Sequence, residues 1–397
     1  MVNKTKWGYH FHAKTVIVIL GALILFGMAA CLSKYAAEKF PCHVYDAAPE
    51  FIPVKTKTLL IVCGACILAA AYSFYSFYLF SIENGNPGGF GSMIKYIREA
   101  MLEFKSPGRF VGHISIMLEC ISYIFAFIVV RNTIFYGIKA RYILFFIPML
   151  CYMLIITVSG GRTEFIYITV FILMSGFICF MQKHQWEGKY TIRLIIAGLT
   201  AFLVFLLIFR VTGLLKSSGV GVSVFTSLSK YAGFGIPALD EYILNLRPET
   251  GLIGDHTLSS VYSVLRSLGF NLPQLYMPYD FINFPGIDSN IYTALRRYIE
   301  DYTYLGMCVM VVLISSVYTY SFEIIKKKRI FGFALVCFCS FCYPLFEFSI
   351  EERFLMRIIS TTTIYQLLYL SVFYYFFIYR VLKKRKIKKS GLLTTKQ

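Results

Sequence analysis

The sequence predicts an all-α polytopic integral membrane protein with about 9–11 transmembrane helices and one large extracytoplasmic loop. Of its 397 residues, 57% are hydrophobic and only 15% are charged, and the mean hydropathy is +0.65. The apolar residues form long continuous runs, and the strongest basic clusters lie directly beside such runs. A hydrocarbon core of about 30 Å takes about 20 helical residues, so runs of this length predict membrane spans.

Nine apolar runs are long enough to be predicted as spans. The first resembles a signal peptide in position, but it lacks a small-residue cleavage site and many equally apolar runs follow, so we expect it to be retained. Nine spans with a cytoplasmic C-terminus would put the N-terminus outside, whereas Lys4, Lys6 and Lys14 favour the inside. A tenth span or a re-entrant segment is therefore expected near 84–110 or 219–240. The predicted spans are roughly 15–32, 57–80, 111–130, 142–158, 164–181, 192–209, 303–320, 330–346 and 358–379.

The basic residues predict the orientation of these spans. Four segments contain clusters of basic residues, which favours the cytoplasmic side for each of them. They are 131–141, 182–193, 321–330 and the C-terminal tail from Arg380. We therefore expect a multi-pass protein of a bacterial plasma membrane with a cytoplasmic C-terminus. The net charge of +18 is explained by topology and by anionic membrane lipid, and no nucleic acid partner is expected.

Three parts follow along the chain: N-terminal transmembrane helices at 1–209, an extracytoplasmic cap at 210–302, and C-terminal helices with a basic tail at 303–397. The cap is nearly neutral and contains prolines and aromatic residues, which favours a folded loop. Within the cap, apolar and polar residues alternate from Thr257 to Phe270 in the pattern of a short amphipathic helix. Most of the eleven cysteines, the Cys63–Cys66 pair included, are expected to pack within the membrane, and no metal or cofactor is expected.

The turn Gly160-Gly161-Arg162 places a guanidinium between two apolar runs, on the predicted outer side. Two glycines leave backbone N–H groups approachable, and a helix begins at once, so the turn predicts a binding site for phosphate or diphosphate. The alternative is that Arg162 reaches the lipid headgroups as an ordinary boundary arginine.

A second polar group lies where the cap enters the seventh predicted span. Tyr292 and Arg296 share one helical face, and Arg297 and Asp301 share another. Two arginines beside carboxylates predict a site that binds a leaving phosphate and orients a nucleophile. The alternative is a local Arg297–Asp301 ion pair at the start of an interfacial helix.

These motifs resemble those of the Wzy-type oligosaccharide repeat-unit polymerases of bacterial O-antigen and capsule synthesis. The resemblance covers roughly 140–320 and rests on SGGRT at 159–163, a large outer loop, Asn290-x-Tyr292-Thr293, and Asp301-Tyr302 followed by Gly306. The commoner form of the last motif has glycine at the position of Thr303.

The resemblance implies metal-independent, inverting transfer of a glycan from undecaprenyl diphosphate onto a new lipid-linked repeat unit, forming a capsule, exopolysaccharide or O-antigen. It extends the expected partners to undecaprenyl-diphosphate-linked oligosaccharides and to flippase and chain-length regulator proteins of the same pathway. Arginines would stabilise the departing diphosphate, and Asp301, Glu300 or His256 would act as the base. The candidate catalytic residues are Asp301, His256, Arg296 and Arg297, and the candidate substrate-binding residues are Arg162, Gly160, Gly161, Arg210, Arg266, Asn290 and Tyr292.

Three other functions stay open on the sequence. The chain would also suit a ligase that moves a finished glycan to another acceptor, a flippase of the same lipid-linked units, or a non-enzymatic part of an export complex. Three features of the sequence speak against a transporter: it shows no internal repeats, no charge pairs within the predicted spans, and a single bulky outer loop. The remaining acidic cluster, from Glu347 to Arg353, is expected to be a solvated loop, and the alternative is that it lines the same cavity as the other site residues.

Overall fold

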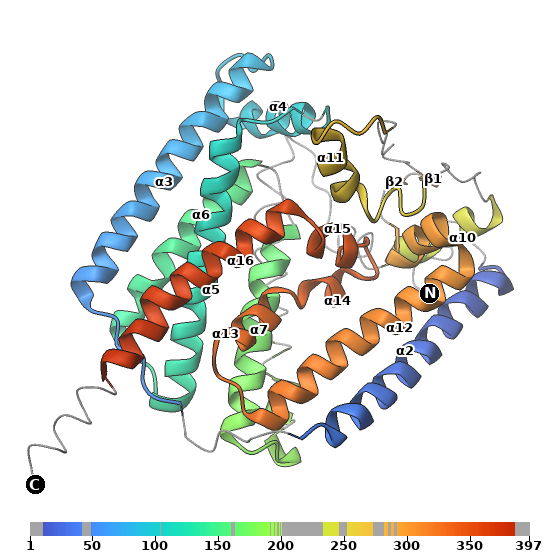
Figure 1. Cartoon of the computed structure of the whole chain (residues 1–397). Coiled ribbons are helices and arrows are strands. Elements are labelled where there is room, and N and C mark those ends of the chain that lie inside the picture. The colour runs from blue at the N-terminus through green and yellow to red at the C-terminus, as the bar shows by residue number, and fades with distance from the viewer. Residues whose placement is uncertain are drawn as a thin grey trace, which may run out of the picture. The chain divides into compact units, whose positions relative to one another are not determined.

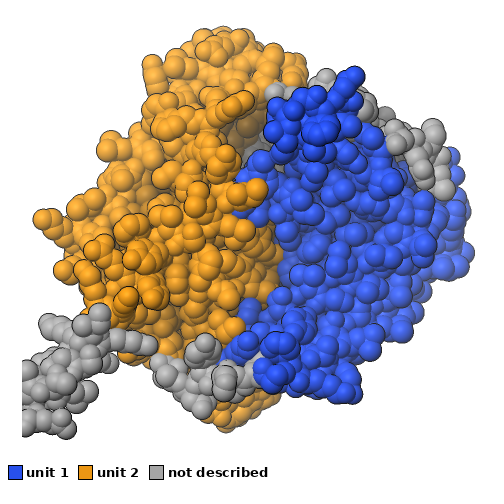
Figure 2. Space-filling model, in the orientation of Figure 1, with its two compact units in different colours: residues 1–43, 222–328, 344–363 blue, residues 44–221, 329–343, 364–397 orange. Residues whose placement is uncertain are grey.

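The protein is predominantly helical in the computed structural model (Figure 1). The structure describes residues 11–41, 49–103, 105–159, 163–190, 192–193, 195–196, 198, 200, 233–245, 252–272, 282–284, 287–289 and 292–385. These residues fall into two compact units, coloured separately in Figure 2. Unit 1 contains Met1–His43, Val222–Lys328 and Pro344–Thr363, and unit 2 contains Val44–Gly221, Arg329–Tyr343 and Ile364–Gln397.

Unit 1 is built on two long helices that lie side by side, α2 (Ala13–Lys39) and α12 (Ala294–Lys328) (Figure 1). The buried residues of α2 are all small, and they include Ala29, Ser33 and Ala37 at intervals of one helical turn. Small residues let helix backbones approach closely in a membrane, where lipid offers no hydrophobic penalty for the large residues on the other face. Because the two backbones are close, the Ser315 hydroxyl of α12 can donate a hydrogen bond to the Phe26 carbonyl of α2 at 2.7 Å.

The other elements of unit 1 lie around these two helices. An antiparallel hairpin pairs two short strands in the register Ile282↔Ser289. The predicted amphipathic helix within 257–270 is confirmed, with narrower bounds, as α11. The elements are α10 (Gly235–Leu244), α11 (Ser259–Ser267), β1 (Ile282–Phe284), β2 (Ile287–Ser289), α14 (Tyr343–Glu347, most of it in this unit), α15 (Phe354–Ile358) and the start of α16 (Thr361–Tyr374).

Unit 2 is a helical bundle in which α5 (Arg109–Tyr136) is the most buried element. Between Leu118 and Ile128 every residue of α5 is buried, and Tyr123 stacks on Phe171 of α7 at 4.6 Å between ring centroids. Burial on all sides, of a stretch that is mostly apolar, is expected of a central helix. Around it lie α3 (Thr56–Glu83), α4 (Phe90–Leu102), η1 (Ala140–Phe146), α6 (Ile147–Ser159), α7 (Thr163–Lys183), η2 (Gly188–Tyr190), α13 (Phe333–Ser340), the rest of α16 and η3 (Tyr375–Tyr379).

The predicted multi-pass membrane architecture is confirmed. Seven helices within the described residues are long and apolar enough to cross a membrane. They are Ala13–Lys39, Thr56–Glu83, Arg109–Tyr136, Ala140–Ser159, Glu164–Lys183, Ala294–Lys328 and Thr361–Arg385. Each contains or largely overlaps one predicted span, because a run of apolar residues matched to the bilayer thickness satisfies its backbone polar groups only as a helix.

Two predicted spans differ from this picture, and the expected tenth stays open. The run 192–209 lies largely outside the described residues. The run 330–346 forms two short helices, α13 and α14, separated at 341–342. Pro344, the second residue of α14, has no N–H to donate to the Ser340 carbonyl, so α13 cannot continue through it. Within 84–110 the structure has α4, whose 13 residues are too few to cross a membrane, and 219–240 lies mostly outside the described residues.

Candidate functional site

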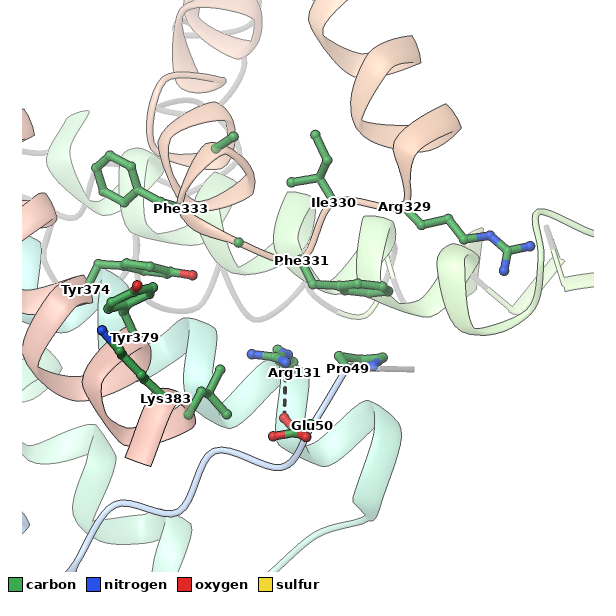
Figure 3. Close-up of a pocket in the computed structure, with 13 residues that line it drawn as sticks. Pro49, Glu50, Arg131, Arg329, Ile330, Phe331, Phe333, Tyr374, Tyr379 and Lys383 are labelled. Atoms are coloured by element: carbon green, nitrogen blue, oxygen red, sulfur yellow. Dashed lines mark hydrogen bonds between the residues drawn. The ribbon is translucent and has the colours of Figure 1, made fainter. Parts of the chain in front are cut away.

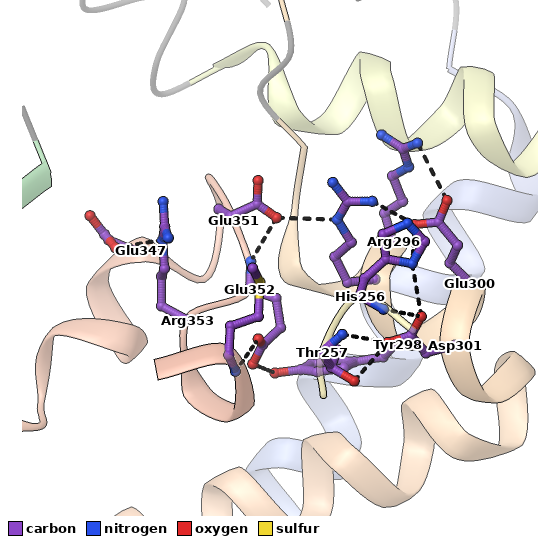
Figure 4. Close-up of polar contacts among 12 residues, drawn as sticks. His256, Thr257, Arg296, Tyr298, Glu300, Asp301, Glu347, Glu351, Glu352 and Arg353 are labelled. Carbon is purple, nitrogen blue, oxygen red and sulfur yellow. Dashed lines mark hydrogen bonds and ion pairs between the residues drawn. The ribbon is translucent and has the colours of Figure 1, made fainter. Parts of the chain in front are cut away.

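The predicted catalytic residues lie together in unit 1, at the first turns of α12 (Figure 4). Two further segments reach them, residues 254–257 before α11 and the loop 347–353 between α14 and α15. Backbone hydrogen bonds hold that loop against the start of α12, from Tyr292 N to the Ile350 carbonyl at 3.1 Å and from Ala294 N to the Phe348 carbonyl at 2.9 Å. We call the group the α12 cluster; it contains His256, Thr257, Arg296, Arg297, Tyr298, Glu300, Asp301, Glu351 and Glu352.

Asp301 is the most strongly bonded carboxylate of the cluster. One oxygen accepts from the backbone N–H of His256 at 3.2 Å and lies 2.9 Å from its ring Nδ1. The other accepts from the backbone N–H of Thr257 at 2.7 Å and from its hydroxyl at 2.6 Å. With both oxygens engaged and only 1% of its side chain exposed, Asp301 is placed to orient His256 rather than to take a proton itself.

The contact with Asp301 also determines which ring nitrogen of His256 carries a proton. A carboxylate only accepts hydrogen bonds, so Nδ1 is the protonated nitrogen of the neutral ring, and Nε2 is then its proton acceptor. The side chain of His256 is 7% exposed. Beside it, Oδ1 of Asp255 is buried and has no hydrogen-bond partner among the described residues. A ligand hydroxyl donating to that oxygen would satisfy it.

Arg297 is held between two carboxylates. Its Nη1 donates to Glu300 at 2.9 Å and its Nε donates to Glu351 at 3.3 Å. The predicted Arg297–Asp301 ion pair is therefore wrong: Asp301 points to His256 and Thr257 instead. Glu351 lies 54 residues further along the chain. Arg297 therefore has a partner that the spacing of residues on its own helix does not predict.

Arg296 is almost fully buried, with 1% of its surface exposed. The carbon of its guanidinium lies 3.6 Å from the centroid of the Tyr292 ring and 5.0 Å from that of Tyr242. Its Nη2 also reaches Glu300 at 3.5 Å. Burial, followed by the negative charge of Glu300, raises the pKa of Tyr242 to about 12, and Arg296 opposes that rise. Stacking on two aromatic faces fixes the plane of the guanidinium in a place from which water is excluded.

Glu352 is the fully buried carboxylate of the cluster. It accepts hydrogen bonds from the Tyr298 hydroxyl at 2.9 Å and from the backbone N–H groups of Leu355 and Met356 at 2.7 and 3.0 Å. Burial raises the pKa of Glu352, and these three hydrogen bonds only partly offset the rise. The expectation that 347–353 is a solvated loop is wrong, since Glu347 and Glu352 are 1% and 0% exposed. They are buried because the loop folds onto α12.

The backbone around the cluster is tightly constrained. Thr303 interrupts α12 with φ 64° and ψ −176°, so the helix consists of two segments that meet there. A Cβ on Gly306 would lie 2.0 Å from Cβ of Tyr302, and a Cβ on Gly254 would lie 2.7 Å from the Tyr302 hydroxyl. That hydroxyl lies 2.6 Å from Thr257 Oγ1. The break thus lets Tyr302 support the segment that carries His256.

The structure brings together five of the predicted site residues: His256, Tyr292, Arg296, Arg297 and Asp301. Arg266 lies on α11, where its Nη2 donates to Ser263 one turn earlier at 3.3 Å. The remaining candidates, which are Gly160, Gly161, Arg162, Arg210 and Asn290, lie outside the described residues, so the predicted diphosphate turn stays a prediction.

Sequence reasoning missed several partners of the cluster. Thr257 and Tyr298 were not singled out, although Thr257 directly follows His256 and could have been found from that adjacency. Tyr298 and the burial of Glu352 had no local signal. In unit 2 it also missed Glu119, a carboxylate in the predicted span 111–130 that is 3% exposed and accepts hydrogen bonds from Tyr123 at 2.9 Å and Gln366 at 3.1 Å. Its charge inside an apolar run was the available signal.

The charges of the α12 cluster decide what it can do chemically. Carboxylates outnumber guanidinium groups, and Arg297 already has two of them as partners. A diphosphate at Arg297 would have to replace Glu300 or Glu351. The arrangement is ready for proton transfer at His256, and it could bind an anion only after Arg297 exchanged partners.

No group of three or more His, Cys, Asp or Glu side chains within the described part of the chain could hold a metal ion. No protein-family model, curated protein or solved structure matches the chain.

Proposed function

We propose that the protein is a membrane glycosyltransferase that polymerises undecaprenyl-diphosphate-linked oligosaccharide units into a surface polysaccharide at the outer face of the plasma membrane. The observation that carries the proposal is the His256–Asp301 pair beside two arginines at the entrance to an apolar helix. A base and cations at the level where a lipid-linked sugar diphosphate would emerge suit transfer between two lipid-linked substrates.

In the proposed step, a hydroxyl oxygen of the acceptor sugar attacks the anomeric carbon of the donor glycan. The bond between that carbon and the diphosphate oxygen breaks, and its electron pair leaves with the undecaprenyl diphosphate. The hydroxyl proton passes to Nε2 of His256, while Asp301 holds Nδ1–H and stabilises the imidazolium that forms. The buried oxygen of Asp255 would accept a hydrogen bond from a neighbouring sugar hydroxyl.

The negative charge that develops on the diphosphate needs cations. Arg297 would contribute after exchanging Glu300 or Glu351 for a phosphate oxygen, and Arg162 would contribute from the Gly160-Gly161-Arg162 turn. Substrate binding would thus be coupled to release of a carboxylate, which is then free to contact sugar hydroxyls. Such interactions act on the transition state, where the charge is largest.

The test uses purified protein in nanodiscs with undecaprenyl-diphosphate-linked repeat units and no added nucleotide sugar. We expect a ladder of polymer, and we expect His256→Gln to slow its growth about 100-fold or more, because a positioned general base contributes about 10²–10⁴-fold. His184→Gln, at a histidine whose ring packs against Tyr190 in unit 2, is the matched control and should leave the ladder unchanged. Arg162→Ala should also stop growth. Unchanged chain length in His256→Gln and Arg162→Ala would refute the proposed roles.

Asp301→Asn separates orientation from general structural support. A neutral amide no longer stabilises the imidazolium that forms in the transition state, so kcat should fall while KM stays nearly unchanged. A purely structural role would change KM and the yield of folded protein as well. Transfer of finished glycan to a different acceptor, with no ladder, would favour the ligase alternative.

One observation favours a second candidate, a transporter of the same lipid-linked units. Glu119 is a buried carboxylate inside a candidate span, and such residues often mark ion or proton pathways. Movement of a labelled lipid-linked oligosaccharide across a vesicle membrane, lost in Glu119→Gln and kept in His256→Gln, would support this alternative over the polymerase.

A further inference from the structure

A cavity near the C-terminal end of α5 lies wholly within unit 2 and takes no part in the proposed transfer (Figure 3). It has a volume of about 640 Å³, which is in the range of small-ligand sites. Its walls come from residues 49–50, from Arg131, from the segment 329–334, and from residues between 374 and 383. These parts are far apart in sequence, so the cavity is a product of the fold.

Arg131 is the buried charge of this cavity. It is only 4% exposed, and its Nη2 donates to the Glu50 carbonyl at 3.0 Å. Its Nε is also buried and has no hydrogen-bond partner among the described residues. A buried cation with an unused donor is costly unless an anion or water supplies the missing contact, so the cavity favours an anionic occupant.

The other charged groups on the walls support an anion. The lining residues include three cations, Arg131, Arg329 and Lys383, but one carboxylate, that of Glu50. In Figure 3 the guanidinium of Arg329 points away from Arg131, and the nitrogen of Lys383 lies beside Tyr374 and Tyr379, across the view from Arg131. Arg131 is therefore the cation placed to contact a ligand directly, and Lys383 adds positive charge on another wall of the same cavity.

The position of the cavity along its helices indicates a lipid rather than a soluble anion. Arg131 is near the end of the candidate span Arg109–Tyr136, and Lys383 is near the end of Thr361–Arg385, where lipid headgroups would lie. Tyr374 and Tyr379 line the same walls. Tyrosines are enriched at the membrane–water interface, and basic pockets between transmembrane helices bind acidic headgroups.

We propose that this cavity binds the phosphate headgroup of an anionic phospholipid, with Arg131 contacting the phosphate oxygens and Lys383 attracting the headgroup from another wall of the cavity. The site is separate from the α12 cluster, so the proposal is independent of the glycosyltransferase activity. A bound lipid would supply the contact that Arg131 Nε lacks and would link the ends of two spans of unit 2.

The experiment measures lipid retention by native mass spectrometry. Full-length protein is stripped of lipid in detergent and incubated with phosphatidylglycerol or with phosphatidylcholine, in the presence or absence of inorganic phosphate. The variants are Arg131→Gln, Lys383→Gln and the matched control Lys384→Gln, which changes the adjacent exposed lysine that does not line the cavity.

We expect the wild type and Lys384→Gln to retain phosphatidylglycerol equally and in preference to phosphatidylcholine. Lys383→Gln should reduce retention about fivefold, and Arg131→Gln about tenfold or more. Equal retention by all four proteins, or equal retention of both lipids, would overturn the proposal, as would complete displacement of phosphatidylglycerol by millimolar inorganic phosphate. If Arg131→Gln does not fold, the comparison of Lys383→Gln with Lys384→Gln decides the question alone.

Discussion

Replacing Thr303 by glycine should stabilise the protein. Thr303 has φ 64° and ψ −176°, a backbone conformation that is essentially restricted to glycine and that is least suited to a β-branched residue. The structure thus places threonine where the local geometry requires glycine.

The size of the effect follows from two opposing contributions. A non-glycine residue in this region costs about 1–3 kcal/mol, and glycine removes that strain. Glycine also loses more conformational freedom on folding, which costs about 0.5–1 kcal/mol. The two ranges leave a net gain for Thr303→Gly of up to about 2.5 kcal/mol, with a central value of about 1 kcal/mol.

Two control variants isolate the backbone effect. Thr303→Ala keeps a Cβ and should show no comparable gain, because alanine is disfavoured in the same conformation. Thr319→Gly makes the same substitution inside the regular part of α12 and should cost about 0.3–1 kcal/mol, because glycine is a poor helix former. The two glycine variants should thus change stability in opposite directions.

The assay is thermal unfolding of detergent-solubilised protein, with the folded fraction followed by fluorescence-detected gel filtration. Thr303→Gly should raise the midpoint by roughly 1–4 °C. A midpoint equal to or below that of the wild type, or an equal rise in Thr303→Ala, would refute the argument from backbone strain at this position.

The remaining predictions concern packing and pH. Gly306→Ala should lower stability by about 1–3 kcal/mol in the same assay, because the new Cβ would lie 2.0 Å from Cβ of Tyr302; an unchanged midpoint would contradict the close approach. Ala29→Leu should prevent the close packing of α2 and lower the midpoint, whereas Leu32→Ala, at a position 68% exposed, should leave it nearly unchanged. Because burial raises the pKa of Glu352 in the folded state, its contribution to stability is fully present below the ordinary glutamate pKa and is lost as the pH rises through the raised value. The wild type should therefore gain stability relative to Glu352→Gln as the pH falls toward the ordinary glutamate pKa, and parallel profiles for the two proteins would contradict the raised pKa.

Part of the site was predictable because its residues are neighbours on one helix or lie in one short loop. Arg296, Arg297 and Asp301 belong to the first turns of α12, and His256 was the only histidine of the predicted outer loop. Their types alone indicated acid–base or phosphate chemistry. The partners of these residues were not predictable, because Glu351 reaches Arg297 across 54 residues of sequence and Thr257 reaches Asp301 across 44.

The sequence alone determined that this protein crosses a membrane several times and roughly where. A span needs an uninterrupted apolar run matched to the thickness of the bilayer, and such a run is a local property of the chain. Only the tertiary structure decided which carboxylate pairs with which cation, that Glu352 is buried, and that Thr303 breaks α12. Those outcomes depend on backbone pairing and close approach between distant segments, which no local period of the sequence encodes.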